Sequence, residues 1–229
     1  MNIGVTGLAG SGKSTVSKFL AKPYGLYINA DDIAHEALND EVIVKKLVNL
    51  YGEKIYQDGV LQRSLLAEIV FNSKEELVKL EEVIHPYVRE KMKLCLDKNT
   101  RLGSYFVVEV PLLVEKGFSK FMDINICVEA SFETRYKRVK RQRNWSKKDL
   151  INRDLNQNVT QKKEVCDFIL DSDAPLYEIE HTCKKIVSVF RYFTVTHNNS
   201  ELRKEALIKF FKNELNDSLI IAFNEYARR

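Results

Sequence analysis

The sequence has few residues of the kinds that mark disordered, fibrous or membrane-spanning chains. Among its 229 residues there are only 9 Gly and 4 Pro, which argues against long disordered linkers, collagen and low-complexity sequence. The longest apolar stretches, such as residues 106–114, are interrupted by Glu109 and Pro111, and none approaches the ~20 apolar residues that span a bilayer. The start of the chain has no basic region followed by an apolar one, so no secretory signal is visible.

The cysteines are also few, and none of them is closely spaced with another. The four of them are scattered without Cys-x-x-Cys spacing, so we expect reduced, mostly buried thiols and a cytoplasmic protein. Hydrophobic residues make up 45% and charged residues 30%, as in ordinary soluble proteins. A chain of this length buries a core that needs no disulfide or metal. The net charge of +4 permits anionic substrates but does not by itself indicate nucleic acid.

Apolar runs alternate with helical patterns along the first 193 residues. Residues 105–110 and 124–128 are nearly continuous apolar runs, typical of strands buried on both faces of a parallel sheet. Shorter strands are expected at residues 1–6, 26–30 and 168–170, and helices at 14–21, 132–158 and 175–193. The alternation predicts an α/β fold with a mainly parallel sheet, and we expect a three-layer core built on it.

A long helical stretch separates the second and third predicted strands. It runs over residues 33–97, with breaks at Asn39-Asp40, Tyr51-Gly52, Asp58-Gly59 and His85-Pro86. Because it is too long for a crossover connection, we expect a core of residues 1–35 and 99–193 and an inserted helical domain of residues 36–98. After a linker-like segment, residues 200–229 are expected to form a helical extension with these apolar residues on one face: Leu202, Leu207, Phe210, Phe211 and Leu215.

Residues 7–14, Gly-Leu-Ala-Gly-Ser-Gly-Lys-Ser, match Gly-x-x-x-x-Gly-Lys-[Ser/Thr] at every fixed position. This phosphate loop lies between a predicted strand and a predicted helix, the context that the motif requires. Its glycines let successive N–H groups point at phosphate oxygens, and the helix presents its partial positive charge to them. Lys13 can reach the β- and γ-phosphates, and the Ser14 hydroxyl can bind Mg²⁺. We expect nucleotide binding by Gly10, Ser11, Gly12, Lys13, Ser14 and Thr15.

Nucleotide binding alone does not define the reaction. A GTPase switch normally needs an Asp-x-x-Gly element, and no such tetrapeptide occurs in the sequence. Residues 146–149, Ser-Lys-Lys-Asp, resemble a guanine-specificity motif only weakly, because they lie in a predicted basic helix instead of after a strand. An ATP-dependent kinase of a small molecule is therefore the favoured interpretation.

Two acids, Asp31 and Asp32, follow the second predicted strand, at the end of the sheet where open α/β folds bind ligands. If that strand lies near the first, Asp31 faces the crevice of the γ-phosphate. A carboxylate there can accept the proton of a substrate hydroxyl or help to hold Mg²⁺. Both acids can instead cap the following helix. We favour the functional role for Asp31 and the capping role for Asp32.

Glu109 interrupts the apolar third strand just before Pro111. A charge at such a place is costly unless it is used or paired. Glu109 can bind Mg²⁺ through water, or it can be a buried acid that accepts hydrogen bonds from backbone donors. The sequence leaves both roles open.

Several segments, taken in order, resemble the dephospho-CoA kinase family. After the phosphate loop come Asn29-Ala30-Asp31-Asp32-Ile33-Ala34, Arg63 with Leu66-Ala67 and Phe71, Ile84-His85-Pro86, Pro111-Leu112-Leu113-Val114-Glu115, and Arg153 with Gln157. The phosphate loop is shared with many families, whereas this ordered combination is specific, and it covers residues 1–193. Asn29 stands where the family has the first acid of Asp-Ala-Asp.

The resemblance implies transfer of the γ-phosphate of ATP to the ribose 3′-hydroxyl of dephospho-CoA, the final step of coenzyme A biosynthesis, with Mg²⁺ as cofactor. It implies Asp31 as the catalytic base, beside Lys13. It also implies that the inserted domain binds the acceptor, with Arg63, His85 and Arg89 as candidate contacts. For His85, a local cap beside Pro86 is an equal alternative.

Residues 135–148 carry eight Lys or Arg and no acid. They can form a solvated helix face, a nucleic-acid patch or a lid that closes over the triphosphate, where arginines bind phosphate oxygens. We favour a basic lid of residues 135–160. Arg138 matches a family arginine, and Arg141 or Arg143 can replace the family arginine that is missing near Gln142.

Two rival functions remain. A kinase for another nucleotide or nucleoside is distinguished by testing acceptors side by side. An ATP-regulated nucleic-acid-binding module predicts salt-sensitive binding to DNA or RNA and no phosphorylated product. We expect ATP and dephospho-CoA as the partners of the chain, with no nucleic acid and no membrane, and we leave an oligomer open.

Overall fold

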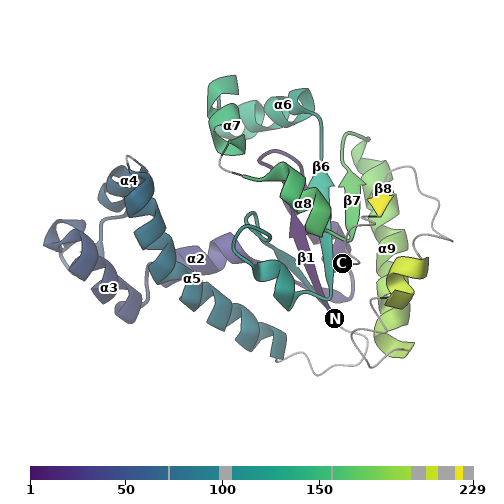
Figure 1. The fold of residues 1–229 in the computed structure, drawn as a ribbon, viewed down its shortest axis with the longest axis horizontal. Helices are drawn as coiled ribbons and strands as arrows, with labels where there is room; N and C mark the ends of the chain where they lie inside the picture. Colours follow the sequence, from purple (N-terminus) through teal and green to yellow (C-terminus); the bar gives the residue numbers. More distant parts are fainter. Residues whose placement is uncertain (72, 98–104, 156, 197–204, 211–219, 224–229) are drawn as a thin grey trace. The chain divides into compact units, whose positions relative to one another are not determined.

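A six-stranded sheet is the centre of the computed structural model of the chain, which describes all residues except 72, 98–104, 156, 197–204, 211–219 and 224–229. The strands lie in the order β2-β5-β1-β6-β7-β8. Figure 1 shows the sheet with the helices that surround it. Its strands are β1 (Asn2–Thr6), β2 (Gly25–Asn29), β5 (Tyr105–Glu109), β6 (Ile124–Glu129), β7 (Phe168–Asp171) and β8 (Ile220–Phe223).

The central strands run parallel, as predicted. β1 pairs in parallel with both β5 and β6, so that Ile3 lies opposite Val107 on one side and Ile124 on the other. β6 continues the parallel pairing with β7. β5 is buried along its whole length and β6 along nearly all of it, which explains their continuous apolar sequences.

Helices cover both faces of this sheet. On one face, α1 (Lys13–Ala21) packs on α9 (Leu176–Thr196), and alternate strand residues such as Ile126 and Val128 join their core. Cys127 points to the opposite face because side chains alternate along a strand. There it packs near α8 (Val159–Val165). The predicted three-layer α/β fold is confirmed. No helix in the described part of the chain is long and apolar enough to cross a membrane.

The end of the chain differs from the predicted helical extension. Residues 205–210 are helical, and Leu207 among them is buried. However, β8 is a strand that pairs antiparallel with β7, so the helix expected there is wrong. The open edge of β7 offers unpaired backbone groups, and the β-branched Ile220 and Ile221 suit a strand. Of the predicted apolar face, Leu202, Phe211 and Leu215 lie outside the described residues.

The chain divides into two compact units, and Asn29–Lys98 form the second one. Within it, α2, α3 and α4 each pack on α5. The acceptor-binding role of residues 36–98 stays a prediction. The elements of this unit are α2 (Ala30–Ala37), α3 (Glu41–Tyr51), a 3₁₀ turn (Glu53–Ile55), β3 (Tyr56–Gln57), β4 (Val60–Leu61), α4 (Arg63–Phe71) and α5 (Lys74–Asp97).

Helix α2 begins earlier than expected, at Ala30 instead of Ile33. Its N-cap is Asn29, whose side-chain oxygen accepts a hydrogen bond from the Asp31 backbone N–H at 3.0 Å. The capping role that we favoured for Asp32 is therefore wrong, because an amide side chain one residue before the helix already fills it.

Two of the predicted helix breaks, at Asp58-Gly59 and at His85-Pro86, differ from each other in the structure. Asp58 and Gly59 both have positive φ, 51° and 77°, and form the turn of the β3–β4 hairpin. Helix α5, in contrast, continues through Pro86, where we predicted a break. A proline inside a helix costs about 3 kcal/mol. The residues at helical spacing around it, Ile84, Val88 and Met92, are all buried, and their packing offsets that cost.

Candidate active site

The phosphate loop leaves the end of β1 and enters α1 in the conformation that the motif predicts. Gly10 has a φ of 76°, and a Cβ atom on it would come within 2.7 Å of the Arg135 carbonyl oxygen. A Cβ atom on Gly7 would collide with the Val128 carbonyl oxygen. These glycines are therefore required by close contact with β6 and α6 (Phe132–Arg143).

Helix α1 starts directly at the end of this loop. Gly12 is its N-cap residue, with a left-handed φ of 86°, and no side chain caps the helix. Lys13 is the first helical residue, Ser14 and Thr15 follow, and the first turn holds no acid. An uncapped helix N-terminus with a lysine and two hydroxyls is suited to bind phosphate.

Two arginines of α6 hold the carbonyl side of the phosphate loop. Arg135 is 5% exposed and donates to the Ala9 carbonyl at 3.2 Å, and it also makes a bidentate pair with Asp154 at 2.9 and 2.7 Å. Arg138 donates to the Gly10 carbonyl at 3.3 Å. The two arginines thus hold carbonyl groups of the loop in place, while within the loop the Ser11 N–H donates to the Leu8 carbonyl at 3.1 Å.

Arg138 also connects the loop to the residue after β7. It donates to the Ser172 hydroxyl at 3.0 Å and to the Ser172 carbonyl at 2.5 Å. The Ser172 hydroxyl in turn donates to the Ser11 carbonyl at 2.5 Å. The predicted ATP contact of Arg138 stays a prediction. Sequence reasoning missed Arg135 and Ser172 as loop supports, because neither belongs to a local motif.

The other predicted lid arginines lie near the end of α6. Arg141 and Arg143 are exposed. The guanidinium of Arg143 lies 4.9 Å from the ring centre of Trp145, and that of Arg153 lies 4.1 Å from it. Burial and the positive charge of Arg143 lower the pKa of Arg153. Two guanidinium groups on one ring form a positively charged feature that favours an anion.

The segment predicted to be a lid contains two helices with a tight turn between them. Asn144 ends α6 with a left-handed φ of 54°, and Ser146 begins α7 (Lys147–Asp154) in a capping box with Asp149. Both partners of that box belong to the Ser-Lys-Lys-Asp tetrapeptide. Its resemblance to a guanine-specificity motif is therefore explained by helix capping.

The Glu109 carboxylate accepts hydrogen bonds from two side-chain hydroxyls. One of its two predicted roles had backbone N–H groups as the donors instead. Glu109 is 3% exposed. It accepts from the Ser14 hydroxyl at 2.6 Å and from the Tyr27 hydroxyl at 2.5 Å. This arrangement places an acid from β5 against the first turn of α1. Tyr27 was not predicted, since a tyrosine in a short strand carries no signal of its partner.

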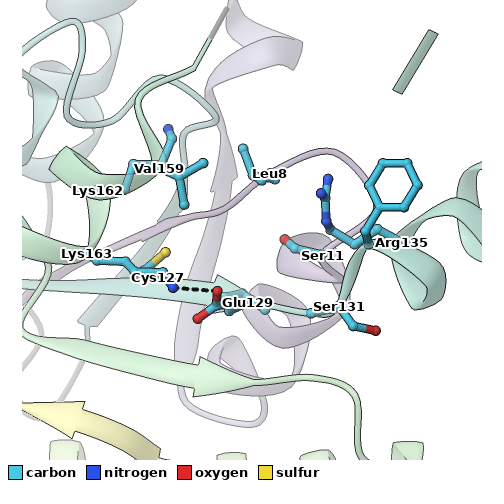
Figure 2. A pocket seen from close by; sticks show the side chains of 12 residues that line it. Leu8, Ser11, Cys127, Glu129, Ser131, Arg135, Val159, Lys162 and Lys163 are labelled. Atoms are coloured by element: carbon cyan, nitrogen blue, oxygen red, sulfur yellow. Dashed lines mark ion pairs between the residues drawn. The ribbon is translucent and has the colours of Figure 1, made fainter. Parts of the chain in front are cut away.

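A cavity of about 260 Å³ lies beside the phosphate loop, between β6, α6 and α8 (Figure 2). An ion pair of Lys163 with Glu129, at 2.6 Å, lies in its wall. Of the predicted site residues only Ser11 lines it, so this cavity is not the predicted nucleotide site. Its lining is Leu8, Ser11, Cys127, Val128, Glu129, Ala130, Ser131, Phe132, Arg135, Val159, Lys162 and Lys163.

The predicted base and acceptor contacts belong to the second unit. Asp31 is exposed in the first turn of α2. Arg63 donates to the Asn39 side chain at 2.8 Å. Arg89 donates to the His85 carbonyl at 3.4 Å, one turn away on α5. The catalytic role of Asp31 and the acceptor contacts of Arg63, His85 and Arg89 stay predictions.

A mainly parallel sheet between helical layers, with a phosphate loop from its central strand and a lysine opening the next helix, defines a P-loop nucleotide-binding protein. The family model described as dephospho-CoA kinase matches residues 1–178. The chain therefore belongs to the dephospho-CoA kinase family, whose reaction is the last step of coenzyme A biosynthesis.

Individual relatives agree with this assignment. The chain is 32% identical to a dephospho-CoA kinase of Fusobacterium nucleatum over 198 residues, which cover 81% of this chain and 98% of the relative. A crystal structure of a Thermus thermophilus protein has a TM-score of 0.70 at 30% identity and covers 82% and 96% of the two chains. A dephospho-CoA kinase from Campylobacter jejuni has a TM-score of 0.64 at 25% identity and covers 83% and 97%.

Proposed function

We propose that this chain transfers the γ-phosphate of ATP to the ribose 3′-hydroxyl of dephospho-CoA and so forms coenzyme A. The observation that carries the proposal is the phosphate loop that opens into Lys13 of α1 in a chain of this family. The loop supports the binding of the nucleotide, and membership of the family supports dephospho-CoA as the acceptor. The predicted cytoplasmic location and the oligomeric state stay open to experiment.

The phosphate loop and the lid bind the nucleotide in this proposal. Backbone N–H groups of residues 10–15 and the Lys13 ammonium bind the β- and γ-phosphates. Arg141 and Arg143 add positive charge from the lid, where it neutralises the charge that develops during transfer. Arg138, which donates to the Gly10 carbonyl, supports the loop from α6 and adds its own charge near the phosphates.

In this proposal the second unit binds the acceptor and supplies the base. Arg63, His85 and Arg89 bind the phosphates or the adenosine of dephospho-CoA. Asp31 accepts the proton of the 3′-hydroxyl while the oxygen of that hydroxyl bonds to the γ-phosphorus. The bond from that phosphorus to the bridging oxygen breaks, and ADP leaves.

Magnesium is expected beside Ser14 and Glu109. Oxygen ligands suit this hard cation, and the hydroxyl and the carboxylate lie 2.6 Å apart at the start of α1. Among the described residues there is no cluster of three metal-ligating side chains, so phosphate oxygens and water are expected to complete the set. When bound, Mg²⁺ neutralises negative charge on the phosphates.

The change Glu109→Gln tests this assignment. The amide keeps the size of the side chain and removes its charge, so we expect a loss of about 10- to 100-fold in Mg²⁺ affinity or activity. The measurement is a Mg²⁺ titration of the rate, paired with calorimetry of ATP binding at low and high Mg²⁺. Tyr27→Phe is the matched control, because it removes the other hydroxyl contact of Glu109 and leaves the charge. An unchanged Mg²⁺ dependence in Glu109→Gln removes Glu109 from the magnesium site.

The reaction itself is tested with the full chain, Mg²⁺-ATP and dephospho-CoA, and the product is identified by mass spectrometry. We expect coenzyme A, which is dephospho-CoA with one added phosphate, together with ADP. Adenosine, AMP and other nucleotides, assayed side by side, test the rival nucleotide kinase. Salt-dependent binding of DNA or RNA without any phosphorylated product would replace the proposal with the nucleic-acid-binding alternative.

A further inference from the structure

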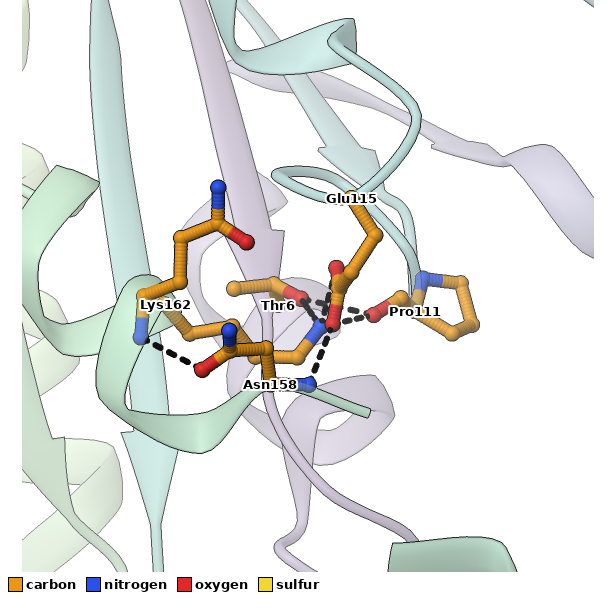
Figure 3. Close-up of polar contacts among 6 residues, drawn as sticks. Thr6, Pro111, Glu115, Asn158 and Lys162 are labelled. Carbon is orange, nitrogen blue, oxygen red and sulfur yellow. Dashed lines mark hydrogen bonds and ion pairs between the residues drawn. The ribbon is translucent and has the colours of Figure 1, made fainter. Parts of the chain in front are cut away.

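Lys162 is a buried lysine that the proposed reaction does not use. Its side chain is 1% exposed, and its ammonium donates to Glu115 Oε2 at 2.9 Å, to Thr6 Oγ1 at 3.2 Å and to the Pro111 carbonyl at 2.5 Å. Figure 3 shows these acceptors converging on the ammonium. A lysine has three N–H donors, so each donor has an acceptor.

The acceptors come from the carboxyl ends of two neighbouring strands. Thr6 is the last residue of β1 and directly precedes Gly7 of the phosphate loop. Pro111 follows β5, two residues after Glu109. The Thr6 hydroxyl also donates to the Pro111 carbonyl at 3.0 Å. Lys162 therefore joins the start of the phosphate loop to the segment that follows Glu109.

The second oxygen of Glu115 connects this point to the end of the lid. Asn158, the N-cap residue of α8, donates its backbone N–H to Glu115 Oε1 at 3.1 Å. Lys162 lies one turn later on the same helix, and its N–H donates to the Asn158 carbonyl. Glu115 thus holds the place where the chain returns from the lid, and the same carboxylate holds the Lys162 ammonium.

Stability alone does not account for such a pair. Removing an ammonium and a carboxylate from water costs more free energy than their attraction commonly returns, and apolar replacements of both are often neutral or stabilising. The adjacent Lys163 pairs with Glu129 where both side chains are more than one-third exposed, the ordinary situation of a surface pair. The buried pair is therefore better explained by the geometry that it imposes.

We propose that Lys162 and Glu115 are positioning residues for phosphoryl transfer, which set the start of the phosphate loop against β5 and the end of the lid. This inference rests on the proposed function. Misplacement of a binding element by about 1 Å can lower a rate about 10²-fold. Loss of the pair is expected to act on nucleotide binding and transfer, while the fold remains.

The double variant Glu115→Leu with Lys162→Met separates positioning from stability. Lys162→Met alone leaves the carboxylate buried without its ammonium, so its urea midpoint is expected to fall markedly. The double variant removes both charges and leaves the Thr6–Pro111 hydrogen bond, so its midpoint is expected to return near that of the wild type. Its kcat/KM for ATP, measured where all variants are folded, is expected to stay roughly 10- to 100-fold low. Lys163→Met is the matched control and should equal the wild type in both measurements.

A double variant with a wild-type midpoint and wild-type kcat/KM would overturn the proposal, because the pair would then be structural only. If the double variant does not fold, Glu115→Gln decides, since it keeps the side-chain shape and removes the charge. A lower kcat/KM in folded Glu115→Gln supports positioning, and a wild-type value overturns it.

Direct ATP binding separates this proposal from the proposed function. The probe is a fluorescent ATP analogue, and its anisotropy needs no acceptor. A wild-type chain that binds the analogue but makes no coenzyme A rejects the proposed function. Weaker binding of the analogue by the double variant still supports the positioning role in that case, and equal binding rejects it.

Discussion

Lys13→Ala is expected to lower phosphoryl transfer by about 10³-fold, near the upper end of what one well-placed electrostatic group contributes. The lysine is the first residue of α1, where its ammonium and the helix N-terminus act on the same phosphates. Alanine is the best helix former, so α1 should be retained and the urea midpoint should change little. The measurements are the initial rate of coenzyme A formation and the affinity for the ATP analogue.

Lys22→Ala is the control for Lys13→Ala. Lys22 is the exposed C-cap residue of the same helix, at the end away from the phosphate loop. It removes the same charge from the same helix and should leave transfer unchanged. If both variants lose activity equally, the net charge of α1 matters and the specific place of Lys13 does not.

The phosphate loop could be predicted because its information is local. Eight consecutive residues fix where a glycine must stand, and Gly12, the second glycine that the pattern fixes, does have a positive φ, 86°. The central strands were equally predictable, because β5 and β6 are buried on both faces and leave no polar alternation to misread. Sequence patterns of this kind indicate the backbone conformation and the burial of the residues that form the pattern.

The contacts that complete the site could not be predicted in the same way. Glu109 and Tyr27 lie 82 positions apart, and Lys162 and Glu115 lie 47 apart. The first pair is formed by the order of strands in the sheet, where β2 lies beside β5, and the second pair joins α8 to the segment that follows β5. The motif that contains Glu115 was visible in the sequence, but nothing in it indicates a buried lysine from α8.

Local signals also failed where packing or an open edge outweighed them. Pro86 is a helix breaker by its own chemistry, yet α5 continues through it, and Ile84 and Val88, two residues to either side, are buried. Ile220 and Ala222 were expected in a helix, yet the edge of β7 gives them strand partners. In the second case the deciding neighbour lies far along the chain, outside the window that a periodicity can read.

Asp31→Asn is expected to lower kcat for coenzyme A formation by about 10²- to 10⁴-fold, the usual contribution of a general base. Asparagine has nearly the same size and cannot take the proton of the 3′-hydroxyl. The cap of α2 uses the backbone N–H of Asp31 and the side chain of Asn29, so the substitution keeps that contact and should leave the urea midpoint almost unchanged. Binding of the ATP analogue should also persist, because the phosphate loop is untouched.

Asp32→Asn is the matched control for Asp31→Asn, since Asp32 is the next residue in the same first turn and is also exposed. The two variants lose the same charge, and they differ only in which direction around the helix the lost carboxylate points. Consecutive helical side chains diverge by about 100°, so a proton acceptor at one position cannot be replaced by the other. Loss of transfer in Asp31→Asn alone supports the base assignment. Full activity in Asp31→Asn excludes it, and equal loss in both variants assigns the effect to the local negative charge.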